Sequence, residues 1–404
     1  MTESILVVLA AVAAACFIAT RYLRGPDLSA LDGPGGDLQG MAIEQRFSSG
    51  DRPNEEHRAI VTMLSGMPGR GEGFPTPARL ARLRTFMDEM FASRHFEALF
   101  IPANAGGVSA EWVIAPGASS TRRTLYIHGG AYAAGSPRSH RVITARFSEI
   151  TGGAVLAIDY RLMPEHSRMA GIEDCRTAYR WMLEFGPRGA QRADTAFVAG
   201  DSAGGNLALS LIAWLRDQGL RAPDAVVALS PFTDSTFGSP SFKTNLATDA
   251  MLGPLFKPLA RLPRAMLLWA GLIVNRIRPS DPLVSPIFGN LSHLPPMLIH
   301  ASQVEMLLDD SRRYVRKAAS AGSSARLQTW NHVVHVWHIF DPALTEATQA
   351  FEEIRKFLAA VVPATDGSHE GPWSASLTSR DLLRDFDRIV SPPPQGTGPR
   401  RLVV

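Results

Sequence analysis

Along much of the chain, short uninterrupted apolar runs alternate with longer segments in which apolar residues recur at helical spacing. Apolar runs of this length are typical of strands that are buried on both faces of a parallel sheet. We predict such strands at residues 124–128, 154–160, 196–200, 225–229, 297–300 and 326–330. Helices are predicted at residues 142–150, 172–183 and 203–215. This alternation predicts an α/β domain with a mostly parallel central sheet and helices on both of its faces.

Two further helical segments lie outside this alternation. Thr76 and Pro77 are typical of a helix start, and apolar residues follow at helical spacing up to Phe91. Between residues 232 and 286 the alternation breaks, which indicates an insertion into the domain. The centre of the insertion, residues 265–274, is strongly apolar and is flanked by Arg261, Arg264, Arg276 and Arg278. It is too short to span a bilayer, so we expect a helix that either lies at a lipid surface or packs against the domain.

The first residues of the chain form an apolar stretch. Residues 4–20 carry no charged side chain, and their length is close to the roughly 17-residue minimum for a helix that crosses a bilayer. Glu3 precedes this stretch and Arg21 and Arg24 follow it, whereas a cleaved export signal begins with positive charge. We therefore expect an uncleaved membrane anchor, with the rest of the chain on the cytoplasmic side because of the two arginines. A cleaved signal of an exported protein, a lipoprotein signal ending at Cys16 and a buried helix are the alternatives.

Composition narrows the class of protein. With 404 residues, 45% of them hydrophobic and 20% charged, the chain is too apolar for general disorder and too mixed for a protein with many membrane spans. The net charge is only +3 and the basic residues are scattered, so we expect no nucleic-acid partner. Cys16 and Cys175 are too few for a disulfide framework. One large domain with appended segments fits these values.

A pentapeptide, Gly-Asp-Ser-Ala-Gly at residues 200–204, stands where a predicted strand gives way to a predicted helix. This is the setting of a nucleophile elbow, in which glycines make room for a sharp turn that exposes the serine, here Ser202. The pentapeptide alone is weak evidence, so its surroundings have to support it. His-Gly-Gly-Ala at residues 128–131 also follows a predicted strand. Its Gly129 and Gly130, together with Ala203, are candidates for the backbone N–H donors of an oxyanion hole, and an ordinary glycine turn is the alternative.

Three motifs occur in order along the chain: Tyr-Ile-His-Gly-Gly-Ala-Tyr at residues 126–132, Asp-Tyr-Arg-Leu-Met-Pro-Glu-His at 159–166 and Gly-Asp-Ser-Ala-Gly-Gly-Asn at 200–206. In this combination the chain resembles the bacterial hormone-sensitive-lipase family of α/β-hydrolases over roughly residues 122–360. The resemblance implies a serine esterase without cofactor or metal, which takes an acyl ester or lipid as substrate under a helical cap. The substrate-binding candidates are Ala131, Tyr132, Leu268 and Trp269. The chain departs from the family in carrying Ala131 where a third glycine is common, a change that concerns the shape of the pocket.

The α/β-hydrolase order requires an acid after the serine and a histidine after the acid. Glu305 fits the family spacing for the acid, two residues before a leucine and four before an aspartate, and follows the predicted strand at 297–300. Asp309 and Asp310 are its rivals. They stand at the start of the next predicted helix, where a carboxylate also has a structural role as a cap or a first-turn charge.

Three histidines, His332, His335 and His338, follow the predicted strand at residues 326–330 at a spacing of three. Only His335 matches the histidine of the family, so it is the predicted base. The other two are interpreted as packed or capping histidines. No aspartate or glutamate accompanies them at ligand spacing, so a zinc site is not expected.

Pattern and resemblance together divide the chain into segments: an anchor at 1–24, a linker at 25–40, N-terminal cap helices at 41–100, a hydrolase domain at 101–362 with a cap insertion at about 232–285, and a tail at 363–404. We expect Ser202, His335 and Glu305 to hydrolyse acyl esters through an acyl-enzyme. The same groups attack lactones, amides and acylated xenobiotics, which are alternative substrates. A binding module on an inactive hydrolase scaffold is an alternative from another class, and the oligomeric state is left open.

Overall fold

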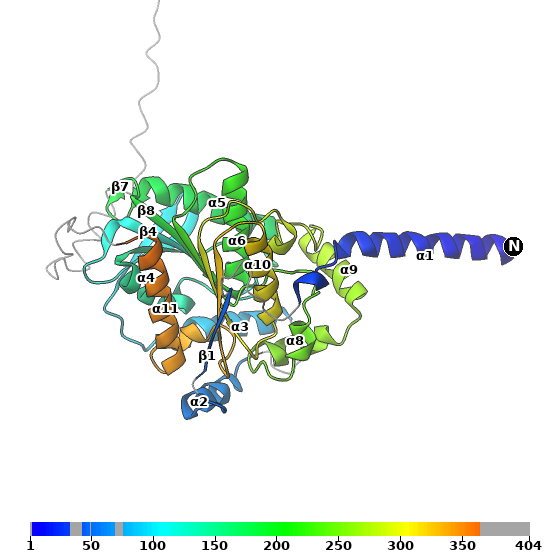
Figure 1. The fold of residues 1–404 in the computed structure, drawn as a ribbon, viewed down its shortest axis with the longest axis horizontal. Coiled ribbons are helices and arrows are strands. Elements are labelled where there is room, and N and C mark those ends of the chain that lie inside the picture. Colours follow the sequence, from blue (N-terminus) through cyan, green and yellow to red (C-terminus); the bar gives the residue numbers. More distant parts are fainter. Residues whose placement is uncertain (1, 33–42, 49, 69–75, 364–404) are drawn as a thin grey trace, which may run out of the picture.

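The structure is a computed structural model and describes residues 2–32, 43–48, 50–68 and 76–363 of the chain. The predicted tail at 363–404 therefore lies outside the described residues except for Pro363, as does the second half of the predicted linker. Within the described residues, a nine-stranded sheet runs through the centre of the molecule in the order β1-β11-β10-β9-β8-β4-β5-β3-β2 (Figure 1). Its strands are β1 (Glu44–Phe47), β2 (Leu99–Ala105), β3 (Val108–Ile114), β4 (Ser119–Ile127), β5 (Gly153–Ile158), β8 (Thr195–Asp201), β9 (Ala225–Leu229), β10 (Met297–Ser302) and β11 (Ala325–Trp330).

Most neighbours in this sheet run parallel. The exceptions are the pairs β2/β3 and β3/β5, which are antiparallel and lie at one end of the sheet. A separate short pair joins β6 (Phe185–Gly186) to β7 (Gly189–Ala190). The α-helices of the described residues are α1 (Thr2–Arg24), α2 (Glu55–Leu64), α3 (Pro77–Glu89), α4 (Arg141–Thr151), α5 (Arg168–Glu184), α6 (Ser202–Asp217), α7 (Ser241–Thr244), α8 (Leu252–Ala260), α9 (Arg264–Asn275), α10 (Leu308–Ser320) and α11 (Thr345–Val361).

The core has two layers because successive side chains of a strand point to opposite faces of the sheet. In β4, Leu125 and Ile127 pack in the cluster formed with α5 and α6, whereas Tyr126 packs in the cluster formed with α4 and α11. A third cluster joins α6 and α10 to β9, β10 and β11. Helices α5, α6 and α10 therefore cover one face of the sheet, and α4 and α11 cover the other.

The predicted fold class is confirmed, and so are the predicted core elements. The predicted strand at residues 225–229 has the bounds of β9, and the helix predicted at 203–215 is α6 with one or two more residues at each end. Thr76 is the N-cap of α3, because its hydroxyl accepts the backbone N–H of Arg79. The apolar segment predicted at 265–274 lies within α9.

One part of the expectation for residues 41–100 changes. We expected cap helices there, and α2 and α3 lie in this range, but residues 44–47 form strand β1 at the edge of the sheet. β1 pairs in parallel with β11, in the register Glu44 to Leu327. Its sequence, Glu-Gln-Arg-Phe, has no apolar run, because an edge strand this short is held by its backbone hydrogen bonds more than by buried side chains.

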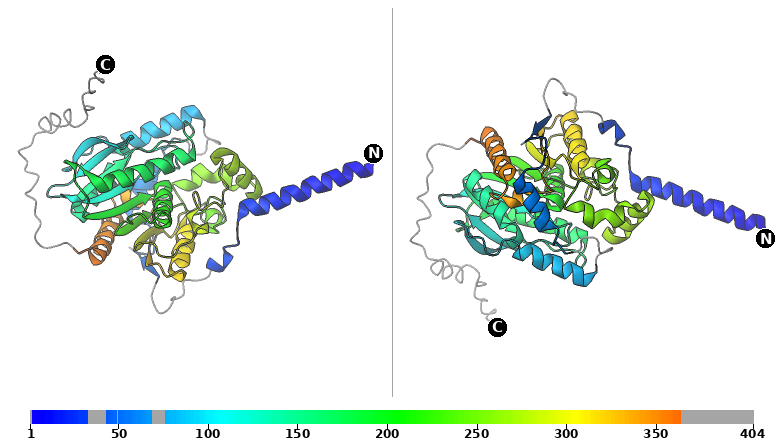
Figure 2. Two further views of the ribbon diagram at one scale, coloured as in Figure 1. Left: turned by 90° about the horizontal axis from the view of Figure 1, so that it is seen from above. Right: turned by 90° about the horizontal axis from the view of Figure 1, so that it is seen from below.

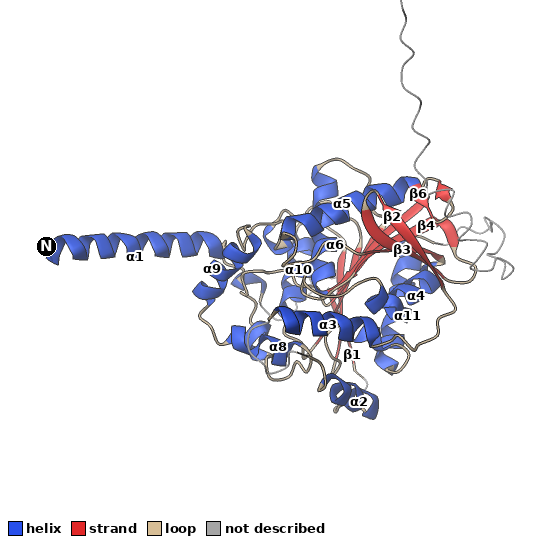
Figure 3. Ribbon diagram, turned by 180° about the vertical axis from the view of Figure 1, so that it is seen from behind, coloured by secondary structure: helices blue, strands red, loops and turns tan. Residues whose placement is uncertain are grey.

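Helices outside the core gather on one side of the molecule. Figure 3 shows α2, α3 and α8 along its lower side and α9 beside α1. Of these, α2 and α3 precede the strands β2 to β11, whereas α7, α8 and α9 lie in the insertion between β9 and β10. Helix α1 projects from the body as a straight rod, and only its C-terminal end meets the rest of the chain (Figure 2). It is the one helix of the described residues that is long and apolar enough to cross a membrane, a test that a signal sequence also passes.

Candidate active site

Ser202 stands at the turn between β8 and α6. Its φ is 51°, in the left-handed region that a residue with a Cβ rarely adopts. Two glycines make this turn possible: a Cβ at Gly204 would lie 1.9 Å from the carbonyl oxygen of Ile127, and one at Gly200 would lie 2.6 Å from the carbonyl oxygen of Gly204. The serine hydroxyl is thereby presented at the N-terminal end of α6, where the helix dipole favours negative charge.

Ser202, His335 and Glu305 are connected by two hydrogen bonds. His335 Nε2 lies 2.9 Å from Ser202 Oγ, and His335 Nδ1 lies 2.6 Å from Glu305 Oε2. The other carboxylate oxygen of Glu305 accepts the backbone N–H of Ser302 at 2.9 Å, which orients the carboxylate. Glu305 and His335 are both buried, and Ser202 is partly exposed. The three residues named from the sequence are thus brought together from β8/α6, from the segment after β10 and from the loop after β11.

The two rival acids bind elsewhere. Asp309 accepts the backbone N–H of Ser241 at 2.8 Å, and Asp310 accepts the backbone N–H groups of Thr233 and Asp234 at 2.7 and 3.0 Å. Asp310 also accepts the hydroxyl of Ser239. Both carboxylates at the start of α10 therefore hold the insertion onto the domain, and neither bonds to His335 in the described contacts.

The loop after β4 carries Gly129 and Gly130, two of the three residues named for the oxyanion hole. Gly130, Ala131 and Tyr132 are three successive residues with positive φ, of 110°, 54° and 63°. Backbone strain of this kind is concentrated at functional sites. The prediction for Gly129 is revised, because its N–H is donated to Asp201 Oδ1 at 3.0 Å and is not free for a substrate. Ala203 is the second residue of α6, so its N–H has no partner within the helix.

The carboxylate of Asp201 holds this loop in place by accepting the N–H of Gly129. Its Oδ1 also accepts the hydroxyl of Tyr126 at 2.6 Å, and its Oδ2 lies 3.4 Å from His140 Nε2. Burial raises the pKa of Asp201, but the charge of His140 and hydrogen bonds from His140 and Tyr126 outweigh burial and lower it. Burial likewise lowers the pKa of His140, and the charge of Asp201 outweighs it and raises that pKa. His128, by contrast, is held neutral by burial, which lowers its pKa to about 3.

Comparison with known proteins identifies the family. Residues 124–339 match the family of proteins with the alpha/beta hydrolase fold. The chain is 39% identical over 254 residues to an acetyl-hydrolase of Streptomyces hygroscopicus, which covers 63% of this chain and 80% of that protein. It is 36% identical over 263 residues to a carboxylesterase/phospholipase of Mycobacterium tuberculosis, which covers 63% of this chain and 67% of that protein.

Solved structures agree with these relatives. An esterase of the bacterial hormone-sensitive lipase family superposes with a TM-score of 0.65 at 32% identity, over 77% of this chain and 99% of that one. The chain is an α/β-hydrolase of the hormone-sensitive-lipase family. An esterase/lipase from an uncultured bacterium gives a TM-score of 0.65 at 35% identity, over 76% of this chain and 99% of that one. The protein is a carboxylic ester hydrolase. The alternative of a binding module on an inactive hydrolase scaffold is therefore wrong.

A second carboxylate, which the sequence did not reveal, lies beside the acid of this hydrolase. Asp249 is a buried residue of the insertion, and its Oδ2 accepts the backbone N–H of Met306, the residue after Glu305, at 2.8 Å. Its Oδ1 accepts the N–H groups of Met251 and Leu252 at 3.0 and 2.8 Å. Since Asp249 and Met306 are 57 residues apart, no local pattern in the sequence signals their contact.

Asp249 also acts on the histidine electrostatically. Burial of the imidazole lowers the pKa of His335, but the hydrogen bond and charge of Glu305 outweigh burial, and Asp249 adds to them. The pKa of His335 is therefore raised above its ordinary value. The cap insertion of the hydrolase thus contributes both a hydrogen bond to the acid loop and negative charge near the base.

The other two histidines have separate surroundings. His338 is buried, and its Nε2 lies 3.0 Å from Nδ1 of His300 on β10. Burial lowers the pKa of His338 well below its ordinary value, so this ring is neutral. His332 has a positive φ of 59° and lies near His57 of α2. Among the described residues, no group of three or more His, Cys, Asp or Glu side chains is arranged to hold a metal.

The four substrate-binding candidates fall into two places. Ala131 and Tyr132 belong to the loop after β4, and the guanidinium of Arg168 lies 3.0 Å from the centre of the Tyr132 ring. Leu268 and Trp269 lie on α9, where Leu268 is buried and the indole N–H of Trp269 is donated to Thr20 Oγ1 of α1 at 3.1 Å. The described contacts of Trp269 are thus with the N-terminal helix and not with Ser202.

Proposed function

We propose that this hydrolase is a serine carboxylesterase in which Ser202 is the nucleophile, His335 the general base and Glu305 the acid that orients it. The observation that carries this proposal is the chain of two hydrogen bonds, 2.9 Å from Ser202 Oγ to His335 Nε2 and 2.6 Å from His335 Nδ1 to Glu305 Oε2. A nucleophile within hydrogen-bond reach of a base, with the base held by a third group, is the arrangement that activates a hydroxyl.

The proton and the acyl group then move in two stages. As Ser202 Oγ attacks the ester carbonyl, its proton passes to His335 Nε2, and the imidazolium that forms is stabilised by Glu305. His335 returns the proton to the leaving alcohol, and the acyl group stays on Ser202. Water attacks this acyl-enzyme with His335 again as base, which releases the carboxylic acid and restores the hydroxyl.

The negative oxygen of the tetrahedral intermediate is assigned to backbone N–H groups. The N–H of Gly129 is committed to Asp201, so Gly130 and Ala203 remain from the predicted set, and the N–H of Ala131 joins them. The left-handed backbone at Gly130 and Ala131 supports this assignment, because successive N–H groups converge on an anion in such conformations. A donor of this kind contributes about 2.7–4 kcal/mol to transition-state stabilisation.

Substitution of the three residues tests the mechanism. We expect Ser202→Ala and His335→Ala each to lower kcat on a soluble short-chain ester by a factor on the order of 10⁴ or more, because triad members act as a unit. Mass spectrometry after reaction with an organophosphonate should find the adduct on Ser202. The matched control is Ser210→Ala, a serine on the same helix whose hydroxyl has no hydrogen-bond partner among the described residues.

The acid has its own comparison. Glu305→Gln should lose most of the activity, whereas Asp309→Asn should retain it, because Asp309 bonds to Ser241 and not to the base. Loss of activity in a folded Asp309→Asn enzyme, with Glu305→Gln active, would contradict the acid assignment. Activity at the wild-type level in Ser202→Ala would contradict the whole mechanism.

The same proposal includes the N-terminal helix as an uncleaved anchor that holds the enzyme at a membrane, with the catalytic domain on the cytoplasmic side. The length and apolar composition of α1 support it, as do the two arginines in its last turn. Cap segments at 41–100, apart from strand β1 of the central sheet, and at 232–285 around a catalytic domain at 101–362 complete the proposed organisation. The substrate class is an acyl ester, in line with the names of the relatives.

A further inference from the structure

Exposed apolar side chains are concentrated on two helices. Among the described residues outside α1, the large apolar side chains that are exposed are Met63, Phe185, Leu220, Met266, Trp269, Ile273 and Val274, and the last four all lie on α9. Single exposed apolar residues are normal on a protein surface, but a group on one helix face marks an interaction site.

Helix α9 has one face that packs against the rest of the protein and one face that is exposed. Leu267 and Leu268 are buried, and Leu267 packs in the same cluster as Met306, the residue after Glu305. On the outer face, Met266, Ile273 and Val274 are 54%, 72% and 63% exposed, and Trp269 is 37% exposed. The spacing of 266, 269 and 273 places these side chains along one stripe of the helix.

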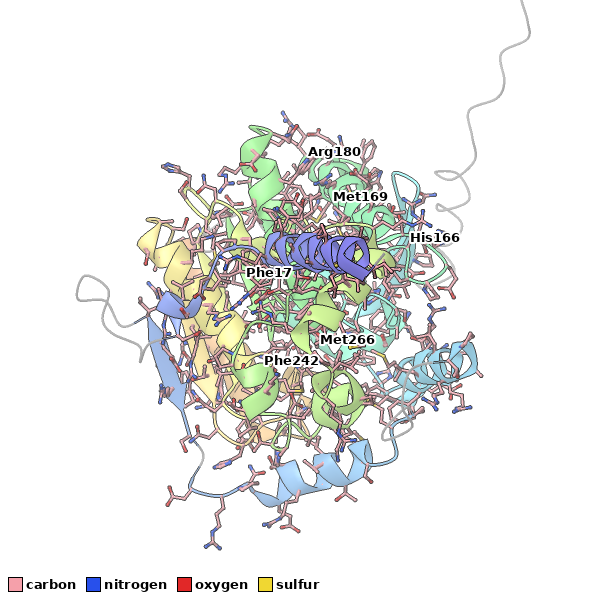
Figure 4. All side chains as sticks on the ribbon, turned by 90° about the vertical axis from the view of Figure 1, so that its right-hand side faces the viewer. Phe17, His166, Met169, Arg180, Phe242 and Met266 are labelled. Atoms are coloured by element: carbon pink, nitrogen blue, oxygen red, sulfur yellow. The ribbon has the colours of Figure 1, made fainter. Side chains whose placement is uncertain are left out.

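The exposed face of α9 adjoins α1. The Trp269 indole N–H is donated to Thr20, the guanidinium of Arg278 lies 4.5 Å from the centre of the Tyr22 ring, and the hydroxyl of Ser280 is donated to the carbonyl of Tyr22 at 3.4 Å. Figure 4 views this side with α1 pointing toward the reader, and both Phe17 on α1 and Met266 on α9 lie on it. The apolar surface of α1 therefore continues onto α9.

The contact between α1 and α9 lies at the C-terminal end of α1. Thr20 and Tyr22 lie in the last turns of the helix, about 6 Å or less from its end at Arg24. Aromatic residues such as Trp269 and Tyr22 favour the level where the hydrocarbon meets the headgroups. Positively charged side chains border both helices: Arg21 and Arg24 in the last turn of α1, Arg261 before α9 and Arg276 after it are exposed, and residues 261–278 include no acidic side chain.

We infer that α9 and the last turns of α1 form one docking surface for a phospholipid bilayer, with Met266, Trp269, Ile273 and Val274 set into the interface and the arginines against anionic headgroups. The occupant is lipid because the surface continues the apolar side of the proposed anchor and carries a basic border. The inference rests on the anchoring proposed above and not on the triad. The anchor then does not hold the catalytic domain at a distance, but seats its cap directly on the membrane.

Spin labels on the full chain test this inference in vesicles of phosphatidylcholine with phosphatidylglycerol. Labels are attached to Ile273→Cys or Met266→Cys in a Cys16→Ala background, and the remaining cysteine, Cys175, is buried. We expect both labels to be relaxed more by oxygen, which dissolves in lipid, than by a water-soluble nickel chelate. The matched control is Leu220→Cys, an exposed apolar position in the segment after α6, where the chelate should dominate. A label on native Cys16 of the unmutated chain reports whether α1 is in the bilayer.

The outcomes separate the alternatives. Labels at 266 and 273 in water while the Cys16 label is in lipid would overturn the inference and leave an anchored domain that stands off the membrane. A Cys16 label in water would overturn both the anchoring and the inference. Contact with a second copy of the chain would show as label-to-label broadening that disappears on dilution with unlabelled protein, and would overturn the lipid assignment.

A charged variant checks the same surface by function. Ile273→Asp with Val274→Asp should move the label at 266 into water and lower hydrolysis of a long-chain ester held in the vesicles by roughly tenfold or more. Hydrolysis of a soluble short-chain ester should stay within about twofold, which also shows that the variant is folded. If the double variant fails that check, Ile273→Ser replaces it. Equal activity of a folded variant on both substrates, with the label still in lipid, would contradict the role of these side chains.

Discussion

At the scale of the residue, the protonation of His335 couples the cap to the chemistry. His335 accepts the proton of Ser202 only when its ring is neutral, and the negative groups around it raise its pKa above the ordinary value. Activity should therefore fall as pH drops through this raised pKa. We expect the acid limb of the pH profile of kcat/KM to lie above pH 6.5, about the ordinary value for histidine.

A substitution at Asp249 should shift the acid limb of the pH profile of kcat/KM. In Asp249→Asn one negative charge near His335 is removed, so the pKa of His335 should fall and the acid limb should shift to lower pH, by roughly one unit or less. The carboxylate of Asp249 uses one oxygen for the N–H of Met306 and the other for the N–H groups of Met251 and Leu252, whereas asparagine has only one acceptor oxygen. One of these contacts is therefore lost, which should also lower the free energy of unfolding by about 1–2 kcal/mol. Asp217→Asn, at the exposed end of α6, is the control and should leave the profile unchanged. Reduced activity at every pH with an unmoved limb would mean that Asp249 only supports the fold.

At the scale of the element, the sequence predicts the strands and helices of the core. It does not predict the strands at the ends of the sheet. Central strands such as β9 and helices such as α6 follow from continuous apolar runs and helical spacing. The hairpin β2/β3 and the edge strand β1 were not predicted, because these strands lie at the ends of the sheet, where the apolar run is broken or absent. Long-range contacts are not predicted for another reason. The N–H of Gly129 is donated to Asp201 because the ends of two strands lie close together in space, and the sequence does not show which strand ends meet.

Helix α3 provides a prediction at this scale, because one of its side chains holds the oxyanion loop. Arg84 donates to the carbonyl oxygens of Ala133 and Met163 at 2.7 and 3.0 Å and pairs with the carboxylate of Glu165 at 2.8 Å. Arg84→Lys keeps the charge but cannot make these bonds together, so the loop should shift and kcat/KM should fall by about tenfold. Glu165→Gln removes only the exposed ion pair and should change kcat/KM less than about twofold. In steady-state kinetics, a kcat/KM of Arg84→Lys within twofold of the wild-type value would show that the hydrogen bonds from Arg84 to the loop do not support catalysis.

At the scale of the whole molecule, both cap segments contact the loops that carry the candidate active site. The N-terminal segment reaches the oxyanion loop through Arg84 of α3, and the insertion reaches the acid loop through Asp249. Helix α9 belongs to the same insertion, and the cluster on its inner face includes Met306. A displacement of the cap at the bilayer would therefore act on both sides of the triad, which gives the docking surface a physical connection to turnover.

The orientation of the whole chain across the membrane is the remaining prediction. Glu3 precedes the apolar stretch of α1 and Arg21 and Arg24 end it, so the positive-inside tendency puts the hydrolase domain in the cytoplasm. The exposed arginines near α9 agree with this side, because the cytoplasmic leaflet carries the anionic lipid that attracts them.

In bacterial spheroplasts that express the full chain, added protease should leave the domain intact until the membrane is opened with detergent. Moving charge should invert the result: Arg21→Glu with Arg24→Glu and Glu3→Arg should expose the domain to protease from outside in a share of the molecules. Digestion of the wild-type domain in intact spheroplasts would instead assign the enzyme to the outer side, and α1 would then be the membrane segment of an exported protein.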